Sequence, residues 1–158
     1  MKQTYPTPTH RTVLGLALAG AMAAGSAAAG TSYSYHNVFD GTPLDVPQRD
    51  VPEPVATFHE TGTNPFVDAP EAIARGKDTY QANCQQCHMP DGSGRIGPNF
   101  LDDQWHYDAT ATMRGRFAIV YAGGAGAMQA FHQKLSQREI LEVLAYIEKL
   151  RGEAEAGE

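Results

Sequence analysis

Two cysteines and a histidine stand together in a Cys-x-x-Cys-His run formed by Cys84, Cys87 and His88, and the chain has no other cysteine. Thiols at this spacing share one helical turn, so both can form thioethers with the vinyl groups of a haem, and the next residue can ligate the iron. Zinc would need a second cysteine pair, and a thioredoxin-like redox pair would need a βαβ unit; the sequence supports neither. The run therefore predicts one covalently bound haem c with His88 as an axial iron ligand.

A second axial ligand would have to reach the haem face opposite His88. Met128 follows His88 by about 40 residues, a length that can pass round the haem edge, and it lies in a loop rich in Gly and Ala, where the backbone can approach closely. We expect Met128 to be this ligand, which would raise the reduction potential relative to bis-histidine ligation. His132, His106 and Met113 are the alternatives, although Met113 falls on an expected helical stripe, where methionine usually fills the core.

Two further residues are expected in the haem surroundings. The second ring nitrogen of His88 needs an acceptor that fixes its tautomer, and the Pro98 carbonyl, in the turn of residues 97–99, is the candidate. The alternative is an ordinary turn. Trp105, the single tryptophan, could donate its indole N–H to a haem propionate or could fill the core. No other group of residues indicates catalysis.

The beginning of the chain has the pattern of a secretory signal peptide. Lys2 and Arg11 precede an apolar run at residues 13–24, and three alanines follow at 27–29. The apolar run of about 12 residues is too short to cross a bilayer comfortably. We therefore expect residues 1–29 to be removed and the protein to be periplasmic, where bacterial haem c is attached; an uncleaved membrane anchor is the alternative.

The charge balance argues against nucleic acid as a partner. The formal net charge is −6, and without Lys2 and Arg11 of the signal peptide it becomes −8, with 10 basic against 18 acidic residues. An acidic protein with two haem propionates favours a basic protein surface as partner. The alternative is that the acidity only keeps the protein soluble.

Residues 30–66 are predicted to form an irregular, extended arm. They are rich in Pro, Gly, Asp and Thr, with no sustained period of 2 or 3.6, and their prolines would interrupt a long helix. A short helical turn is expected near residues 55–60. Aromatic and aliphatic side chains in the arm favour partial packing on the domain that follows.

Residues 67–151 are predicted to form a helical cytochrome domain. The first helix is expected to begin near Asp68, with a capping box formed by Asp68 and Glu71, and to run into the Cys-x-x-Cys-His run. A middle helix is expected over residues 110–121, where apolar residues recur on one face.

The last helix has the clearest pattern. Ser136 and Glu139 form a capping box at its start, and an apolar stripe with the spacing i, i+3, i+4, i+7 follows. Gly152 is expected to end this helix. Residues 152–158 are then expected to be a flexible tail.

The chain resembles a class I cytochrome c over about residues 67–151. The positions that carry the resemblance are Gly76, Tyr80, Cys84, Cys87, His88, Pro98, Met128 and Tyr146. The resemblance implies an all-α fold around one covalently bound haem, in which the first and last helices cross beside the haem and Met128 is the second iron ligand. The irregular arm precedes this domain.

A narrower resemblance is to the cytochrome cL family. It rests on residues 41–46 and 60–65 of the arm, on residues 96–99 and 103–105, and on the stretch from Phe117 to Met128. Such cytochromes accept electrons from periplasmic quinoprotein dehydrogenases that oxidise methanol or ethanol. The resemblance implies an electron-transfer protein, not an enzyme, which takes single electrons from a PQQ-dependent alcohol dehydrogenase and passes them to a downstream cytochrome or oxidase.

Three other functions are compatible with a haem c protein of this length. The chain could be the haem subunit of another periplasmic oxidoreductase complex, although the sequence has no motif for a second cofactor. It could be a ligand-binding or sensor protein with a five-coordinate haem, which would bind carbon monoxide. It could also be a haem subunit of a membrane oxidase complex.

Overall fold

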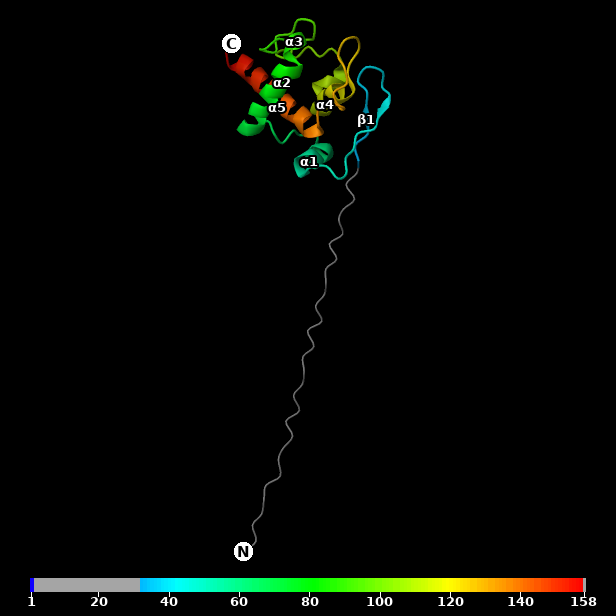
Figure 1. Ribbon diagram of the computed structural model, residues 1–158, viewed down its shortest axis with the longest axis vertical. Coiled ribbons are helices and arrows are strands. Elements are labelled where there is room, and N and C mark those ends of the chain that lie inside the picture. Colours follow the sequence, from blue (N-terminus) through cyan, green and yellow to red (C-terminus); the bar gives the residue numbers. More distant parts are fainter. Residues whose placement is uncertain (2–31, 158) are drawn as a thin grey trace.

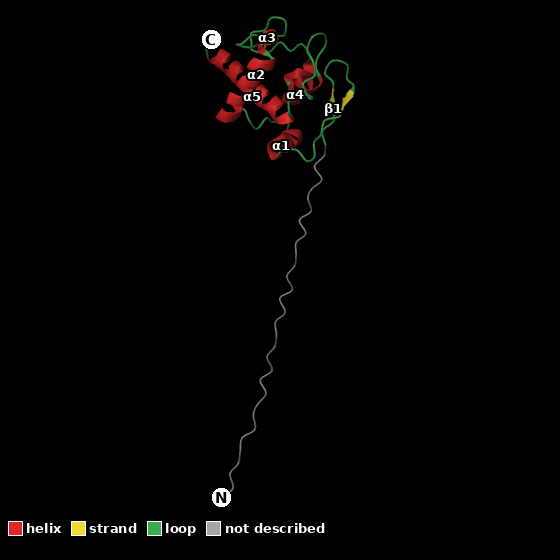
Figure 2. Ribbon diagram, viewed as in Figure 1, coloured by secondary structure: helices red, strands yellow, loops and turns green. Residues whose placement is uncertain are grey.

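The computed structural model describes Met1 and residues 32–157, so the predicted signal peptide lies, apart from Met1, outside the described residues. Helices pack around one another, and a short hairpin lies beside them (Figures 1 and 2). In chain order the elements are β1 (Tyr35–His36), β2 (Pro43–Leu44), α1 (Glu53–Thr61), α2 (Pro70–Asn83), α3 (Gln85–His88), the 3-10 turn η1 (Asp108–Ala111), α4 (Met113–Ala122) and α5 (Gln137–Ala156).

The predicted all-α class is confirmed. The two strands are a minor feature, because they form one antiparallel hairpin in which Tyr35 pairs with Leu44 and His36 with Pro43. None of the helices in residues 32–157 combines the length and the hydropathy that a membrane span requires.

Helices α2 and α5 cross in direct backbone contact (Figure 1). At the crossing the buried Gly76 of α2 faces the Glu142 carbonyl of α5 so closely that an added Cβ would lie 1.9 Å from its oxygen. Tyr80 packs edge-on against Tyr146 one turn further on, with ring centroids 5.3 Å apart. The missing side chain at Gly76 therefore sets the distance between the two helices.

The arm has more regular structure than expected. Besides the hairpin it contains α1, whose first turn includes Pro54 and whose end is capped by Gly62 in the left-handed conformation (φ +78°). Proline suits the first turn because it needs no N–H partner there, and glycine suits the cap because it has no Cβ. The nine residues of α1 bury Val55 and Phe58 completely, so the arm contributes to the core.

A chain of hydrogen bonds through the buried His59 fastens the arm to α5. The Tyr35 hydroxyl lies 2.8 Å from His59 Nδ1, and His59 Nε2 lies 2.6 Å from Gln137 Oε1. Gln137 donates its Nε2 to the Pro47 carbonyl (2.7 Å), so its Oε1 must be the acceptor and His59 carries its proton on Nε2. The neutral form of His59 thus satisfies all of its partners.

The boundaries of two helices differ from the predictions. Helix α2 begins at Pro70 with Ala69 at the N-cap and no side-chain cap, so the predicted capping box of Asp68 and Glu71 is wrong. Proline at the first helical position moves the start beyond Asp68, whose carboxylate then precedes the cap. The middle helix α4 begins later than predicted, since Thr112 accepts a hydrogen bond from Gly115 N and separates α4 from η1.

Helix α5 begins as predicted but extends further. Its capping box of Ser136 and Glu139 is confirmed, with both reciprocal hydrogen bonds present. The predicted stop at Gly152 is wrong, because the helix continues to Ala156. The Lys149–Glu153 ion pair, four residues apart, spans Gly152 and supports this continuation.

Replacing Gly76 with alanine should destabilise the protein. The gain in helix propensity, about 1 kcal/mol, is outweighed by the overlap with Glu142, so we expect a net loss of about 2 kcal/mol or more in the free energy of unfolding. Urea unfolding of the haem-loaded wild type and variant measures this difference in the free energy of unfolding. Gly152→Ala is the matched control, since an added Cβ there meets nothing within 4 Å and should stabilise α5. A stabilised Gly76→Ala variant would contradict the backbone contact.

Acid should weaken the attachment of the arm. Burial lowers the pKa of His59 from its ordinary 6.5. The hydrogen bond to Gln137 raises this pKa, and the positive charge of Arg114 lowers it further. The unfolded chain therefore binds this proton more readily than the folded protein. Stability is full above about pH 6.5 and falls as the pH drops towards the folded pKa, by at most about 1.4 kcal/mol per pH unit.

Urea unfolding across this pH range measures the slope. The added proton would reach Nδ1, where the Tyr35 hydroxyl already donates. His59→Gln should flatten the slope, whereas His36→Gln, at an exposed position in the hairpin, should leave it as in the wild type. An equal slope in the wild type and in His59→Gln would remove His59 as the cause.

Candidate functional site

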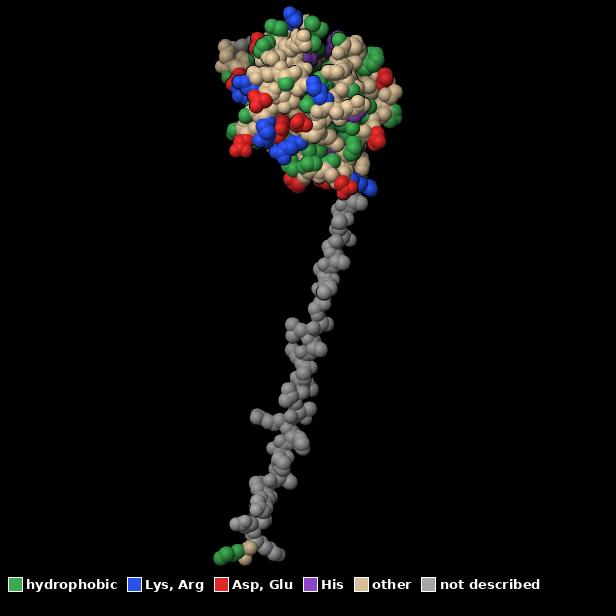
Figure 3. All heavy atoms as spheres, in the orientation of Figure 1, with side chains coloured by type: hydrophobic (Ala, Val, Ile, Leu, Met, Phe, Trp, Pro, Cys, Tyr) green, Lys and Arg blue, Asp and Glu red, His purple; other side chains and the backbone are tan. Residues whose placement is uncertain are grey.

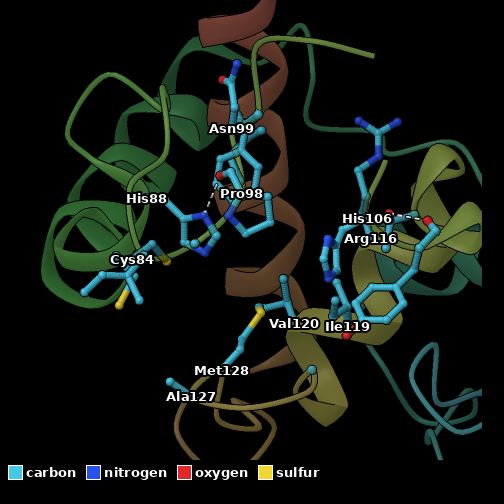
Figure 4. A pocket seen from close by; sticks show the side chains of 18 of the residues that line it. Cys84, His88, Pro98, Asn99, His106, Arg116, Ile119, Val120, Ala127 and Met128 are labelled. Carbon is cyan, nitrogen blue, oxygen red and sulfur yellow. Dashed lines mark hydrogen bonds between the residues drawn. The ribbon is translucent and has the colours of Figure 1, made fainter. Parts of the chain in front are cut away.

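One cavity of about 580 Å³ brings together the residues that the sequence singled out (Figure 4). This volume is within the range of about 300–1,000 Å³ that is usual for cofactor pockets. Its walls come from α3, from the loop between α3 and η1, from α4 and the loop after it, and from α5. The predicted site residues on these walls are Cys84, Cys87, His88, Pro98, Trp105 and Met128.

The single turn of α3 places both thiols and the histidine on the cavity wall. Cys84 caps this turn, and its carbonyl accepts hydrogen bonds from the amides of Cys87 (3.1 Å) and His88 (3.0 Å). Burial raises the pKa of the Cys84 thiol to about 11, and the nearby Cys87 adds to the shift. Cys84 therefore lacks the stabilised thiolate typical of catalytic cysteines.

His88 is held in one orientation and one protonation state. Its Nδ1 lies 3.0 Å from the Pro98 carbonyl oxygen, the contact that the sequence led us to expect. A carbonyl can only accept, so Nδ1 carries the proton and Nε2 keeps a free lone pair. Burial lowers the pKa of His88, which keeps the ring neutral, while the Pro98 hydrogen bond opposes this shift. A neutral imidazole with a free Nε2 is the form that ligates iron.

Two neighbours restrict the ring of His88 further. The Phe100 ring stacks on it, with centroids 4.2 Å apart and an interplanar angle of 17°. Gly97 lies so close that an added Cβ would be 2.3 Å from His88 Cε1. The loop from Gly97 to Phe100 therefore covers one face of the ring and leaves no room for it to turn.

Met128 reaches the cavity from the side opposite His88 (Figure 4). Its loop folds back on α4, because Gly124 N donates to the Met128 carbonyl (3.1 Å) and Phe131 N donates to the Val120 carbonyl (3.1 Å). Gly123 begins this loop in the left-handed region (φ +85°), where a Cβ would also lie 2.8 Å from the Met128 carbonyl oxygen. Glycine at this position lets the loop carry Met128 to the cavity.

The structure separates the alternatives for the second ligand. His132 turns away from the cavity, since its Nδ1 lies 3.0 Å from the Tyr121 carbonyl and its ring stacks on that of Tyr121. Met113 packs against the hydrophobic core and does not line the cavity. His106 does line it, beside α4 (Figure 4). Met128 and His106 are therefore the two candidates that reach the cavity.

Trp105 lies on the cavity wall between two guanidinium groups. The Cζ atoms of Arg116 and Arg151 are 4.9 and 5.0 Å from the centroid of its ring. Arg116 pairs with Glu148, but its buried Nε has no hydrogen-bond partner within the described residues. Arg116 lines the cavity beside Trp105 and brings a positive charge to this wall, which suits a carboxylate.

Sequence reasoning missed Phe100, Arg116 and Arg151. No motif marks them, because isolated arginines on helices usually carry solvated charge, and each acts here through contacts that are distant in the sequence. Phe100 had one signal, its place two residues after Pro98, which brings it near His88.

These residues fit one haem c. The cavity offers two thiols on one turn, the neutral imidazole of His88, the thioether of Met128 and the Arg116 guanidinium for a propionate. Apolar side chains cover the remaining wall and would face the porphyrin, and they include Ile119, Val120, Phe131, Leu144 and Ile147.

The chain is similar to known cytochromes and oxidase subunits. Residues 71–147 match the family model of cytochrome c oxidase, cbb3-type, subunit III. Cytochrome c-L of Methylorubrum extorquens is 33% identical over 147 residues, which cover 87% of this chain and 74% of that protein. The cbb3-type oxidase subunit FixP of Azorhizobium caulinodans is 34% identical over 90 residues, which cover 52% of this chain and 31% of that protein.

Solved structures show the same relationship. Cytochrome cL of the marine methylotroph Methylophaga aminisulfidivorans superposes with a TM-score of 0.70 at 29% identity, covering 74% of this chain and 79% of that one. Cytochrome cL of Hyphomicrobium denitrificans gives a TM-score of 0.68 at 30% identity, covering 75% and 73%. With its class I c-type fold and one covalently bound haem c, the chain belongs to the cytochrome c-L family.

Proposed function

We propose that this cytochrome accepts single electrons from a periplasmic PQQ-dependent methanol or ethanol dehydrogenase and passes them to a downstream cytochrome or oxidase. Cys84 and Cys87 form the haem thioethers, and His88 and Met128 are the axial iron ligands. Membership of the cytochrome c-L family supports the role, and the signal-peptide pattern of residues 1–29 supports the periplasmic location.

One observation supports the proposal: the side chains of His88 and Met128, both of types that can ligate iron, point into the cavity from different walls. The haem supplies a one-electron iron couple, and its axial ligands set the potential. If His88 and Met128 both ligate the iron, they would leave no open coordination position for a substrate or a signalling gas. This arrangement favours electron transfer over catalysis and over a five-coordinate sensor.

The remaining wall residues have supporting roles. The Pro98 carbonyl keeps the proton on His88 Nδ1 and so raises the basicity of the ligand. The Trp105 indole and the Arg116 guanidinium are on the cavity wall and would donate to haem propionates there. These contacts would hold the carboxylates away from bulk water.

The partner is expected to dock where the cavity meets the surface. Cys84 and Cys87 are half-buried there, and Ile96 next to them is 66% exposed. An apolar rim of this kind suits a weak and fast redox encounter. Acidic and basic side chains are interspersed on the face seen in Figure 3, without a single acidic patch. The net negative charge of the whole protein would therefore attract a basic partner from a distance and speed its association.

A second candidate function is that of a haem subunit in a cbb3-type oxidase complex. The family model that matches residues 71–147 and the similarity to FixP favour it. The chain spans about a third of FixP, so this role requires a stable association with other subunits. Purification of the protein with oxidase subunits from its host's membranes would support it.

Replacing Met128 with alanine should open an axial position. We expect the reduction potential to fall by about 0.1 V or more, within the roughly 0.8 V range that axial ligands span, and the reduced protein to bind carbon monoxide. Redox titration and absorption spectra measure both effects. Met113→Ala is the matched control, because Met113 packs outside the cavity and should leave both properties unchanged. An unaltered spectrum and potential in Met128→Ala would leave His106 as the ligand.

Stopped-flow mixing tests the electron donor. The oxidised cytochrome should be reduced rapidly by a purified quinoprotein methanol or ethanol dehydrogenase with its alcohol, and more slowly as salt is added. Ile96→Glu, at the rim, should slow the reaction several-fold, whereas Phe39→Glu, an exposed apolar residue of the hairpin turn, should not.

Each result of this experiment has one meaning. Reduction by one dehydrogenase would identify the alcohol-oxidising partner. Absence of reduction by either, with a haem that dithionite still reduces, would overturn the proposed donor and favour the oxidase subunit.

A further inference from the structure

The segment from Pro98 to Trp105 carries several groups that touch His88 or the cavity. The Pro98 carbonyl accepts the proton of His88 Nδ1, and the Phe100 ring stacks on the imidazole. The indole of Trp105 forms part of the cavity wall. The segment has neither helix nor strand, so regular secondary structure does not hold it in place.

Arg151, in the C-terminal half of α5, holds this segment from the side. Its Nη1 donates to the carbonyl of Phe100 and, at 2.7 Å, to that of Asp102. Its Nη2 lies 2.7 Å from Asp103 Oδ1, and its guanidinium stacks on Trp105. Four residues of one irregular segment thus meet a single side chain that is only 11% exposed.

These contacts link the later part of the segment, residues 99–104, to α5. Among the hydrogen bonds of residues 99–104 in the described chain, those from Arg151 are the ones that reach a helix. The other bond that leaves the segment, from Phe100 N to the Gly92 carbonyl (2.9 Å), joins it to another part of the same loop region. The residues before this stretch are bonded to α3 instead, through Gly97 N to the Cys87 carbonyl (3.0 Å) and through the His88–Pro98 bond, so Arg151 is what connects residues 99–104 to α5.

Arginine suits this task better than any other side chain. Its planar guanidinium presents five donors in a fixed fork, so both hydrogens of one nitrogen can bind two carbonyls at once. Hydrogen bonds from a charged donor are strong, and burial keeps water from competing with them. The Nη1 group of Arg151 is thus fully engaged by the loop backbone.

We propose that Arg151 is a positioning residue for the axial ligand: it holds the loop whose Pro98 carbonyl and Phe100 ring keep His88 in its orientation. This inference rests on the proposed role of His88 as an iron ligand. The bond to Pro98 controls how strongly the imidazole donates to the iron, so Arg151 influences the reduction potential without touching His88.

The carbonyl contacts, rather than the ion pair, carry this role. The Asp103 side chain is 88% exposed, and an ion pair with so exposed a partner contributes little. Asp103→Asn should therefore behave like the wild type. Arg151→Met removes every donor while it keeps an apolar stem, and Arg151→Lys keeps a charge without the fork.

The test is hydrogen exchange of the His88 ring N–H in the oxidised, haem-loaded full-length protein. The paramagnetic iron shifts this proton signal out of the protein envelope in NMR spectra. We expect exchange to be at least about tenfold faster in Arg151→Met and intermediate in Arg151→Lys, because the loop opens more often. The reduction potential should change in the same order.

Arg75→Met and Arg75→Lys are the matched controls. Like Arg151, Arg75 forms an ion pair with a carboxylate, in this case Glu142 of α5. Unlike Arg151, Arg75 does not line the cavity. Both controls should exchange as the wild type does. Wild-type exchange in the Arg151 variants, or equal acceleration in the Arg75 variants, would overturn the positioning role. If Arg151→Met fails to take up haem, the exchange rates of the His88 ring N–H in Arg151→Lys and Arg75→Lys are compared instead. Faster exchange in Arg151→Lys alone would support the positioning role, and equal rates would overturn it.

The same spectra separate this inference from the function on which it rests. A wild-type protein without a shifted His88 ring signal would overturn the ligand assignment itself. A wild-type protein with this signal, and Arg151 variants that share its exchange rate, would overturn only the role of Arg151.

Discussion

The close contact between α2 and α5 is the constraint on which the rest of the structure depends. Gly76 lets the backbone of α2 rest on the Glu142 carbonyl, and this contact sets the angle and the distance of the crossing. Because α3 follows α2 after a single residue, the crossing also decides where the turn with Cys84 and His88 faces. The cavity then forms on the side of α5 that this turn shares with α4 and its loop.

The cavity wall is built from several elements, and they depend on the haem to different degrees. The α2–α5 contact and the arm with α1 are closed by side chains of the chain itself, such as Phe58, Phe117 and Tyr35. The loops that carry Pro98 and Met128 both line the cavity, and no hydrogen bond within residues 32–157 joins one to the other. We infer that the haem completes the core between these loops, whereas the crossing and the arm are packed without it.

Local chemistry in the sequence was sufficient to select residues that the structure places on the walls of one cavity, and to predict the ends of some elements. The thiol spacing, the capping box at Ser136 and the Gly-rich loop around Met128 are each contained in a short window, so one sequence reveals them. Arg151 escaped prediction because its partners lie about 50 positions away and leave no local pattern. The predicted start of α2 was wrong for a different reason. Asp68 is a residue type that often caps helices, but Pro70 at the first helical position decides where the helix begins.

Helix α5 joins the two parts of the molecule that sequence analysis treated as separate. In its first turn Gln137 binds the arm through His59 and Pro47, and fourteen residues later Arg151 binds the loop beside His88. At 1.5 Å per residue these contacts are about 21 Å apart on one rigid helix. The first turn of α5 thus holds the arm and its last turns hold the loop beside His88, so this one helix fixes the position of each part relative to the other.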